Sequence, residues 1–141
     1  MIKEAYVSFE VAKLLKEKGF PQDYDVYHSM VYNEEDYEDE YEVQRMVLET
    51  KLVKAGTLSS YPIGVPEPKC YAPTHQMAMA WLRTKPIIIV VQPEYFNADG
   101  ICSYWGVDIW ADDNYEKLQG DFPSYEEAVE AALKYSLENL I

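Results

Sequence analysis

The chain has 141 residues and carries 25 Asp and Glu against 12 Lys and Arg, which gives a formal net charge of −13. Hydrophobic residues make up 48% of the chain and aromatic residues 14%, and this composition excludes a wholly disordered protein. Because phosphate binding requires clustered Lys and Arg, a sequence pI near 4.4 argues against general affinity for nucleic acid or for anionic membranes.

The start of the sequence and its hydropathy predict a cytoplasmic location. No basic segment followed by an apolar one opens the sequence, so a secretory signal is not expected. The longest unbroken apolar run, 87–91, is far too short to cross a bilayer. Two cysteines, Cys70 and Cys102, do not make a disulfide framework, so we expect both to be free thiols of partly buried strands.

A short amphipathic helix is predicted over residues 9–18. Ser8 is a suitable N-cap, because its hydroxyl can accept a hydrogen bond from an unpaired amide of the first turn. Gly19 favours the left-handed conformation in which many helices end, and Pro21 cannot continue the helix. The apolar stripe of this helix consists of Val11, Leu14 and Leu15.

The next part of the chain contains a predicted hairpin interrupted by an acidic run. Residues 25–32 are rich in β-branched and aromatic side chains, which favour a strand. Seven of the nine residues 34–42 are acidic and the other two are tyrosines, so the run repels itself and predicts a solvated loop. Residues 43–54 fit both a helix and a strand, and we choose a strand because it would pair with 26–32. Gly and Pro then predict a loop over 55–69.

A second helix is predicted to begin after Pro73, with Thr74 as its N-cap and its end near Thr84. Pro86 enforces that end, because the residues before a proline avoid helical backbone angles. The buried face of this helix is expected to contain Met77, Ala78, Trp81 and Leu82. A strand follows over 87–92, and its apolar residues on both faces predict a central strand, covered on both sides or by a helix on one.

A second hairpin is predicted around the turn 97–100, because Asp-Gly readily supplies a positive φ. In its second strand, 101–110, successive side chains are expected to point to opposite faces of the sheet. One face is expected to carry Ile101, Trp105, Val107 and Ile109. The other face is expected to carry Cys102, Tyr104, Asp108 and Trp110. Gly106 is predicted to mark a bulge or a close contact.

The C-terminal part combines a predicted loop with a well-marked helix. Residues 111–123 are polar and predict a loop. Ser124-Tyr-Glu-Glu127 is a capping box, in which the Ser124 side chain reaches forward and Glu127 reaches back. The residues that follow on one helix face are Ala128, Val129, Ala132, Leu133, Ser136, Leu137 and Leu140.

The predicted order of elements is α-β-β-α-β-β-α, a helix and a hairpin used twice and closed by a helix. Hairpins and separated helices imply the α+β class, with an antiparallel sheet and helices packed mainly on one face. We expect residues 1–141 to form a single domain with an acidic loop or excursion near 33–42. The length allows a core large enough to need no metal or disulfide.

Three segments resemble a known group of proteins. They are Ser-Phe-Glu-Val-Ala-Lys-Leu-Leu-Lys-Glu-Lys-Gly-Phe at 8–20, Tyr-Ala-Pro-Thr-His-Gln-Met-Ala-Met-Ala-Trp-Leu-Arg at 71–83, and Tyr-Glu-Glu-Ala-Val-Glu-Ala-Ala-Leu-Lys-Tyr-Ser-Leu-Glu-Asn-Leu at 125–140. They are similar to small uncharacterised proteins carried by phages and mobile elements of gut Bacteroidetes. The likeness covers the predicted helices, a little under a third of the chain. It implies a small α+β protein, and it brings no activity and no catalytic residues.

The residue types that catalysis and metal binding require are sparse. Cys70 and His75 lie close in sequence, but no family-specific sequence surrounds the cysteine, and a polar residue in a first helical turn is the simpler interpretation. No second ligand pair has zinc spacing, and the acidic run lacks the glycine of an EF-hand loop. Neither GxxxxGK[ST] nor GxGxxG is present. We therefore predict no catalytic residues, no metal and no cofactor, and lean away from an enzyme.

The acidic run is the clearest functional signal in the sequence. Removing its seven carboxylates would change the net charge from −13 to −6. Carboxylates interspersed with tyrosines suit a basic protein surface, because Tyr offers contact area at low entropic cost. We predict a non-enzymatic interaction module that docks onto a basic protein partner, as a nucleic-acid mimic or host modulator. Its predicted partner-binding residues are Glu34, Glu35, Asp36, Tyr37, Glu38, Asp39, Glu40 and Tyr41. The simpler alternative is a solvated loop that aids solubility.

Two further hypotheses stay open at this point. One is a small enzyme or ligand-binding domain whose pocket lies between the sheet and the helices, near His75, Cys102, Tyr104 and Trp110. The other is a homodimer formed through the edge of the second hairpin or through 87–91. Direct binding to nucleic acid or to a membrane is not expected, because the charge of the chain opposes both.

Overall fold

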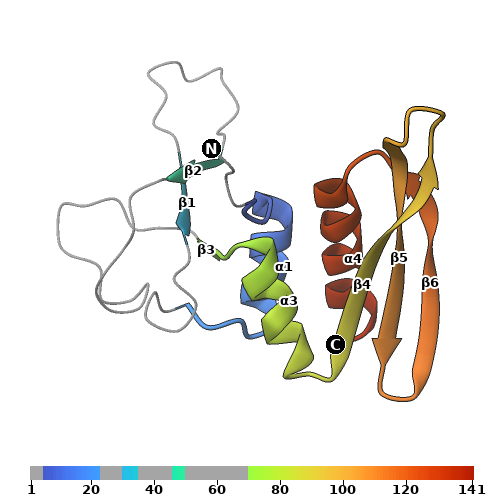
Figure 1. Ribbon diagram of the computed structural model, residues 1–141. Coiled ribbons are helices and arrows are strands. Elements are labelled where there is room, and N and C mark those ends of the chain that lie inside the picture. Colours follow the sequence, from blue (N-terminus) through green and yellow to red (C-terminus); the bar gives the residue numbers. More distant parts are fainter. Residues whose placement is uncertain (1–4, 23–29, 35–45, 50–69) are drawn as a thin grey trace, which may run out of the picture. The chain divides into compact units, whose positions relative to one another are not determined.

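The structure of the chain is a computed structural model (Figure 1). The residues that it describes are 5–22, 30–34, 46–49 and 70–141. They fall into two compact units, here called the N-terminal unit (6–74) and the C-terminal unit (1–5 with 75–141). Both units contain helix and antiparallel sheet, so the predicted α+β class is confirmed. A single domain over the whole chain stays a prediction.

The first helix of the N-terminal unit, α1, spans Phe9–Glu17. The Ser8 hydroxyl accepts a hydrogen bond from the Val11 amide at 3.2 Å, which confirms its predicted capping role. Gly19 follows with a φ of 97°, as the predicted helix end requires. Leu14 is half-buried. The fully buried residues of the helix are Val11, Ala12 and Leu15.

The sheet of the N-terminal unit has the order β2-β1-β3, and both of its pairings are antiparallel. Its strands are β1 (Met30–Glu34), β2 (Met46–Glu49) and β3 (Cys70–Ala72). The choice of a strand within 43–54 is confirmed for β2, which pairs with β1 as the predicted hairpin. Sequence reasoning misses β3, because three residues after a proline-rich stretch show no periodicity. The loop predicted over 55–69 lies outside the described residues.

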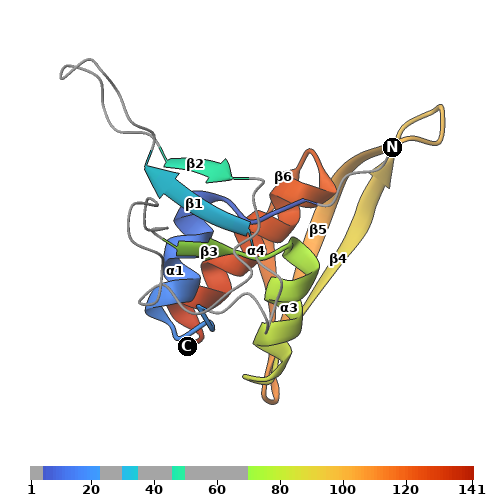
Figure 2. The same ribbon diagram turned by 90° about the vertical axis from the view of Figure 1, so that its left-hand side faces the viewer.

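Strand β3 lies beside α1 within the N-terminal unit (Figure 2). The Tyr71 amide donates to Gln22 Oε1 at 3.0 Å, which ties β3 to the chain that leaves α1. Cys70 is buried and Cys102 of the C-terminal unit is half-buried, and both are free thiols as predicted. Burial raises the pKa of Cys70 to about 11, although lysines of α1 oppose the change.

The C-terminal unit has the order α-β-β-β-α. Helices α3 (His75–Arg83) and α4 (Tyr125–Asn139) pack on the same face of a three-stranded sheet (Figure 1, Figure 2). The strands form an antiparallel meander in the order β4-β5-β6. They are β4 (Ile87–Phe96), β5 (Cys102–Ala111) and β6 (Asn114–Phe122). The expected arrangement, an antiparallel sheet with helices on one face, is confirmed for this unit.

Strand β6 replaces the loop predicted over 111–123, and that prediction is wrong. Its residues are exposed except Leu118 and Phe122, which are half-buried. A strand with so little buried apolar surface shows no alternation of apolar and polar residues in its sequence. The structure forms it because its backbone pairs with β5 through the tight turn at Asp112, where φ is 54°.

Among the strands that the structure describes, β4 lies at the other edge of this sheet, so the prediction of a central strand is wrong. Ile87 is buried, whereas Ile88 and Val90 are 47% and 39% exposed. Of the two kinds of cover predicted for this strand, on both sides or by a helix on one side, the structure shows helices on one side. The apolar residues on the uncovered face of β4 therefore stay in contact with solvent.

The core of the C-terminal unit lies between the sheet and α4. Val107 and Ile109, which were predicted to share one face of β5, are both buried, whereas Ile101 precedes the strand and is 62% exposed. The capping box is confirmed: the Ser124 hydroxyl accepts from the Glu127 amide at 3.1 Å and donates to the Glu127 carboxylate at 3.0 Å. The buried residues of α4 are Ala128, Val129, Ala132, Leu133, Ser136 and Leu137.

Helix α3 has the predicted bounds but a different buried face. Met77 is 40% exposed, so its predicted burial is wrong, and Met79 is buried in its place. The buried stripe follows the spacing i, i+3, i+4, i+7 from the first residue of the helix, not the spacing i, i+1, i+4, i+5. The buried residues are His75, Ala78, Met79, Trp81 and Leu82.

Candidate functional site

Of the acidic run 34–42, only Glu34 lies within the part of the chain that the structure describes. Glu34 is the last residue of β1 and pairs with Met46 of β2. The other predicted partner-binding residues lie outside the described part of the chain: Glu35, Asp36, Tyr37, Glu38, Asp39, Glu40 and Tyr41. The role of this run stays a prediction.

The structure does not bring together the four residues of the alternative pocket. Tyr104 and Trp110 lie on the face of β5 that the helices leave open, because alternate side chains of a strand point to opposite faces. His75 is buried at the start of α3, and its Nε2 lies 2.9 Å from Glu130 Oε1 of α4. The Cys102 thiol donates to the Tyr104 carbonyl oxygen at 3.2 Å, within its own strand.

The His75–Glu130 pair joins the two helices of the C-terminal unit. The Glu130 side chain is 27% exposed, and Nδ1 of His75 is buried without a hydrogen-bond partner in the described part of the chain. No third acid, thiol or imidazole stands beside the pair: among the described residues, no three His, Cys, Asp or Glu side chains are grouped to hold a metal ion. We assign the pair to helix packing.

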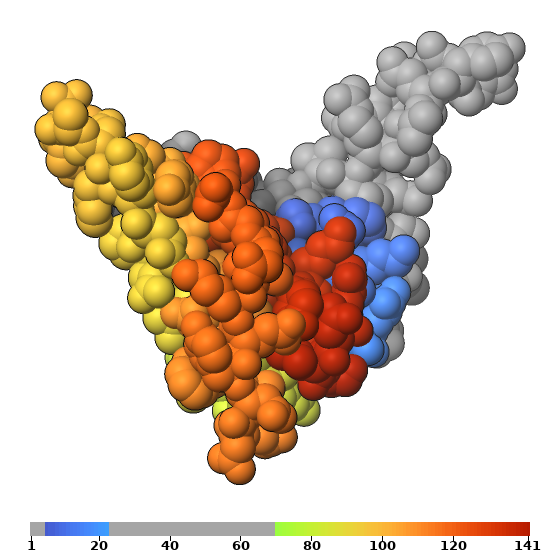
Figure 3. Space-filling model, turned by 90° about the vertical axis from the view of Figure 1, so that its right-hand side faces the viewer, coloured from blue at the N-terminus to red at the C-terminus, as the bar shows by residue number. Residues whose placement is uncertain are grey.

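The candidate site is the surface of the β4-β5-β6 sheet that α3 and α4 do not cover, called the open face. Figure 3 views the C-terminal unit from this side, and the yellow-to-orange strands form its surface. The strand register places side chains from all three strands next to one another. The side chains of the open face are Ile88, Val90, Gln92, Glu94, Tyr104, Asp108, Trp110, Tyr115 and Lys117.

An apolar row crosses one end of the open face. Ile88 of β4 pairs with Trp110 of β5, which pairs with Tyr115 of β6. These three side chains are 47%, 45% and 51% exposed. The centroids of the Trp110 and Tyr115 rings are 4.7 Å apart, with 48° between the ring planes. Large apolar side chains that gather on one exposed surface mark an interaction site more often than single ones do.

A polar network lies next to the apolar row. The Asp108 carboxylate accepts from the Tyr115 hydroxyl at 2.6 Å and from the Gln92 amide at 2.9 Å. The hydrogen bond to Asp108 raises the pKa of Tyr115, because an ionised phenol would lose this bond beside a carboxylate. Lys117 Nζ lies 3.2 Å from Glu94 Oε1, and this bond raises the pKa of Lys117. The network holds these side chains in defined positions.

The sheet that carries the open face is strongly acidic. Residues 87–122 contain seven Asp and Glu and one Lys, so their formal net charge is −6. The single lysine, Lys117, is the one that pairs with Glu94. The potential over this surface therefore attracts cations and repels phosphates.

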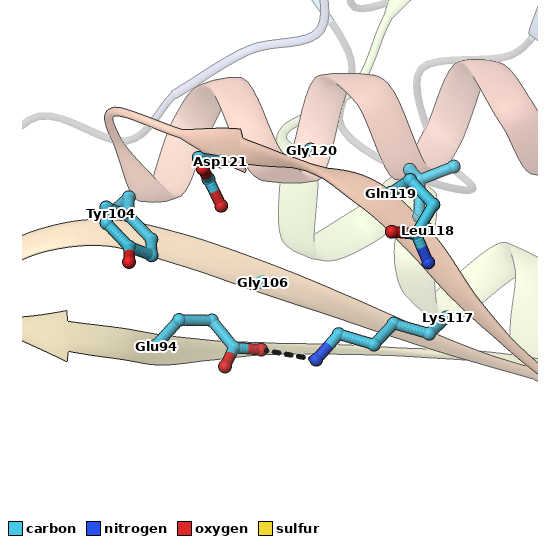
Figure 4. A pocket seen from close by; sticks show the side chains of 8 residues that line it. All are labelled: Glu94, Tyr104, Gly106, Lys117, Leu118, Gln119, Gly120 and Asp121. Atoms are coloured by element: carbon cyan, nitrogen blue, oxygen red, sulfur yellow. Dashed lines mark ion pairs between the residues drawn. The ribbon is translucent and has the colours of Figure 1, made fainter.

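A hollow of about 290 Å³ lies between β5 and β6, toward the end of the open face away from Trp110 (Figure 4). The β5–β6 register shifts between Trp105 and Val107, and such a bulge interrupts the regular pairing of the two strands. A Cβ on Gly106 would lie 2.0 Å from Glu94 Oε1, so the close contact predicted at this glycine is confirmed. The hollow is lined by Glu94, Tyr104, Gly106, Lys117, Leu118, Gln119, Gly120 and Asp121.

Sequence reasoning missed the part of the open face that β6 supplies. Tyr115 and Lys117 face outward, and the residue between them, Glu116, points toward the helices, where it accepts a hydrogen bond from Tyr135 of α4. The alternation is present, but between polar residues. The periodicity of apolar residues therefore gives no signal for this strand.

No protein-family model, no curated protein and no solved structure matches the chain. The likeness to phage and mobile-element proteins therefore stays a prediction, and function has to be argued from the surface itself. None of the helices in the described part of the chain combines the length and the apolar character needed to cross a membrane.

Proposed function

We propose that the protein is a non-enzymatic interaction module whose open face docks an extended basic segment of another protein. The observation that carries the proposal is that the apolar row of Ile88, Trp110 and Tyr115 lies on an exposed sheet face, and that the strands and turns of this sheet, residues 87–122, carry a net charge of −6. Apolar contact area supplies affinity, and the acidic surroundings select the charge of the partner.

A basic polypeptide suits both the apolar row and the acidic side chains of this surface. Lys and Arg side chains have apolar stems and charged ends, so the stems can cover Trp110 and Tyr115 while the ends reach Asp108 and Glu94. Trp and Tyr are the residues that most often dominate binding energy in protein interfaces. Because the acidic side chains are exposed or half-buried, the attraction is expected to weaken as salt is added.

Other occupants fit less well. Nucleic acid would bring phosphates to a sheet whose strands and turns carry seven carboxylates and one paired lysine. A second copy of the chain would bring two segments 87–122, each with a net charge of −6, close together, which opposes a face-to-face dimer. The acidic run at 34–42 would attract the same class of partner, so a test has to separate the two surfaces.

The test uses a labelled basic peptide of about seven residues that alternates arginine with leucine. Fluorescence anisotropy measures its affinity for the full chain at about 50 mM and about 300 mM salt. We expect the double variant Trp110→Ser/Tyr115→Ser to weaken binding by about tenfold or more. The matched control is Phe96→Ser/Ile101→Ser, which removes two exposed apolar side chains from the end of the β4–β5 hairpin.

Three results would contradict the proposal. One is equal loss of affinity in both double variants. Another is full retention in Trp110→Ser/Tyr115→Ser together with loss when the carboxylates of 34–42 become amides, which would move the site to the acidic run. The third is a dimer in sedimentation velocity that Trp110→Ser abolishes, which would make a second copy the occupant.

A further inference from the structure

We propose that the hollow of the open face receives the guanidinium group of an arginine. This inference rests on the proposed docking function and names the residue that the basic partner presents. The shape of the hollow, the balance of its charges and the aromatic ring at one end all favour this group.

The shape of the hollow depends on two glycines. A Cβ at Gly106 would lie 2.0 Å from Glu94 Oε1, so only a residue without a side chain lets Glu94 lie across β5. Gly120 of β6 has a φ of 143°, and a Cβ there would lie 3.0 Å from the Phe122 ring. The walls of the hollow at these positions are backbone, so a ligand group can approach them closely.

The charges that line the hollow do not balance. Two carboxylates, Glu94 and Asp121, face one ammonium group, Lys117. Lys117 pairs with Glu94 at 3.2 Å, and no ion pair forms at Asp121 within the part of the chain that the structure describes. One negative charge is thus left over, and a ligand with a single positive charge would neutralise it. A phosphate or carboxylate ligand would increase the imbalance.

Tyr104 distinguishes arginine from lysine as the bound cation. Figure 4 shows Tyr104 and Asp121 at the same end of the hollow. The Tyr104 ring stacks on Tyr95, with centroids 5.5 Å apart and 11° between the planes, so its position is fixed before a ligand arrives. A guanidinium group is planar, stacks on aromatic rings and binds a carboxylate through two parallel hydrogen bonds. An ammonium group does neither as well.

The test compares N-acetyl-arginine amide with N-acetyl-citrulline amide, which has nearly the same shape and no charge. Each is titrated into the full chain while backbone amide resonances are followed by NMR. We expect arginine to shift the amides of Gly106, Gly120 and Asp121, and citrulline to bind about tenfold more weakly. Asp121→Asn should weaken arginine binding by about tenfold, whereas Asp113→Asn, with the same change of charge in the β5–β6 turn, should leave it unchanged.

The failure of this inference differs from the failure of the docking function. Equal shifts with arginine and citrulline, or equal effects of Asp121→Asn and Asp113→Asn, would overturn the arginine site. If the heptapeptide then still requires Trp110 and Tyr115, and lysine replaces its arginines without loss, docking stands without the hollow. Arginine amide bound at the hollow, with a heptapeptide that ignores Trp110 and Tyr115, would instead overturn the docking function.

Discussion

The two faces of the β4-β5-β6 sheet are made by the same strands and differ in what covers them. Ile109 points to α4 and is 1% exposed, whereas its neighbour Trp110 points the other way and is 45% exposed. The covered face meets the buried residues of α4, and the open face meets solvent within this unit. Both faces carry large apolar side chains.

The difference separates residues that folding explains from residues that it does not. On the covered face, each apolar side chain gains stability from burial against the helices. On the open face, Ile88, Trp110 and Tyr115 gain little of this stability, because about half of each side chain stays in water. The proposed contact with a partner would account for their presence. The comparison therefore makes measurable predictions for stability and for the order of the open face.

The largest predicted effect comes from the adjacent pair in β5. Ile109→Ala should lower the free energy of unfolding by about 2–5 kcal/mol, because it leaves a cavity beneath α4. Trp110→Ala should lower it by about 1 kcal/mol or less, since a substitution at an exposed position leaves no cavity. Urea denaturation followed by circular dichroism measures both. Equal losses in the two variants would show that Trp110 belongs to the core and would remove the distinction between the faces.

The sequence predicted those elements whose conformation is determined by interactions between residues close together in the chain. Ser124 with Glu127, and Ser8 before α1, mark helix starts through local hydrogen bonds, so these bounds were predictable. The strand β6 was not, because an edge strand with two polar faces acquires its conformation from pairing with β5. The same holds for the open face. Alternation along β5 predicted that Tyr104 and Trp110 share one face, but it could not predict whether that face contacts solvent or the helices, because tertiary packing determines this.

An intermediate effect on stability is expected at the N-cap of α4, the helix that covers one of the two faces. Ser124→Ala removes the hydroxyl that accepts from the Glu127 amide, and should lower the free energy of unfolding by about 1 kcal/mol. Ser124→Asp, which keeps a capping acceptor, is the control and should retain the stability. Hydrogen exchange of α4 should rise in Ser124→Ala, while peptide binding at the open face stays the same. Loss of peptide binding would mean that the open face depends on the end of α4.

A smaller effect is expected at the glycine of the hollow. Gly106→Ala forces the Glu94 side chain to move, because the new Cβ would meet it at 2.0 Å. The Lys117 pKa should then fall toward its ordinary value of 10.5, since the hydrogen bond to Glu94 is what raises it. NMR of the Lys117 side chain measures this pKa. Glu94→Gln should lower it as well, and adding Gly106→Ala to Glu94→Gln should lower it no further. Additive changes would show that the two residues act separately.

The smallest predicted effect tests whether the open face is ordered before a partner binds. In Asp108→Asn the Tyr115 pKa should fall toward 10, because the hydrogen bond and the negative charge that raise it are lost. The raised pKa in the folded state also means that the contribution of this bond to stability is present below pH 10 and is lost as the pH rises through the pKa of the folded state. Absorbance at the phenolate band follows the titration, with Tyr115→Phe identifying the signal. An unchanged Tyr115 pKa would mean that the hydroxyl and Asp108 move independently in solution, and the open face would then owe its recognition to the apolar row alone.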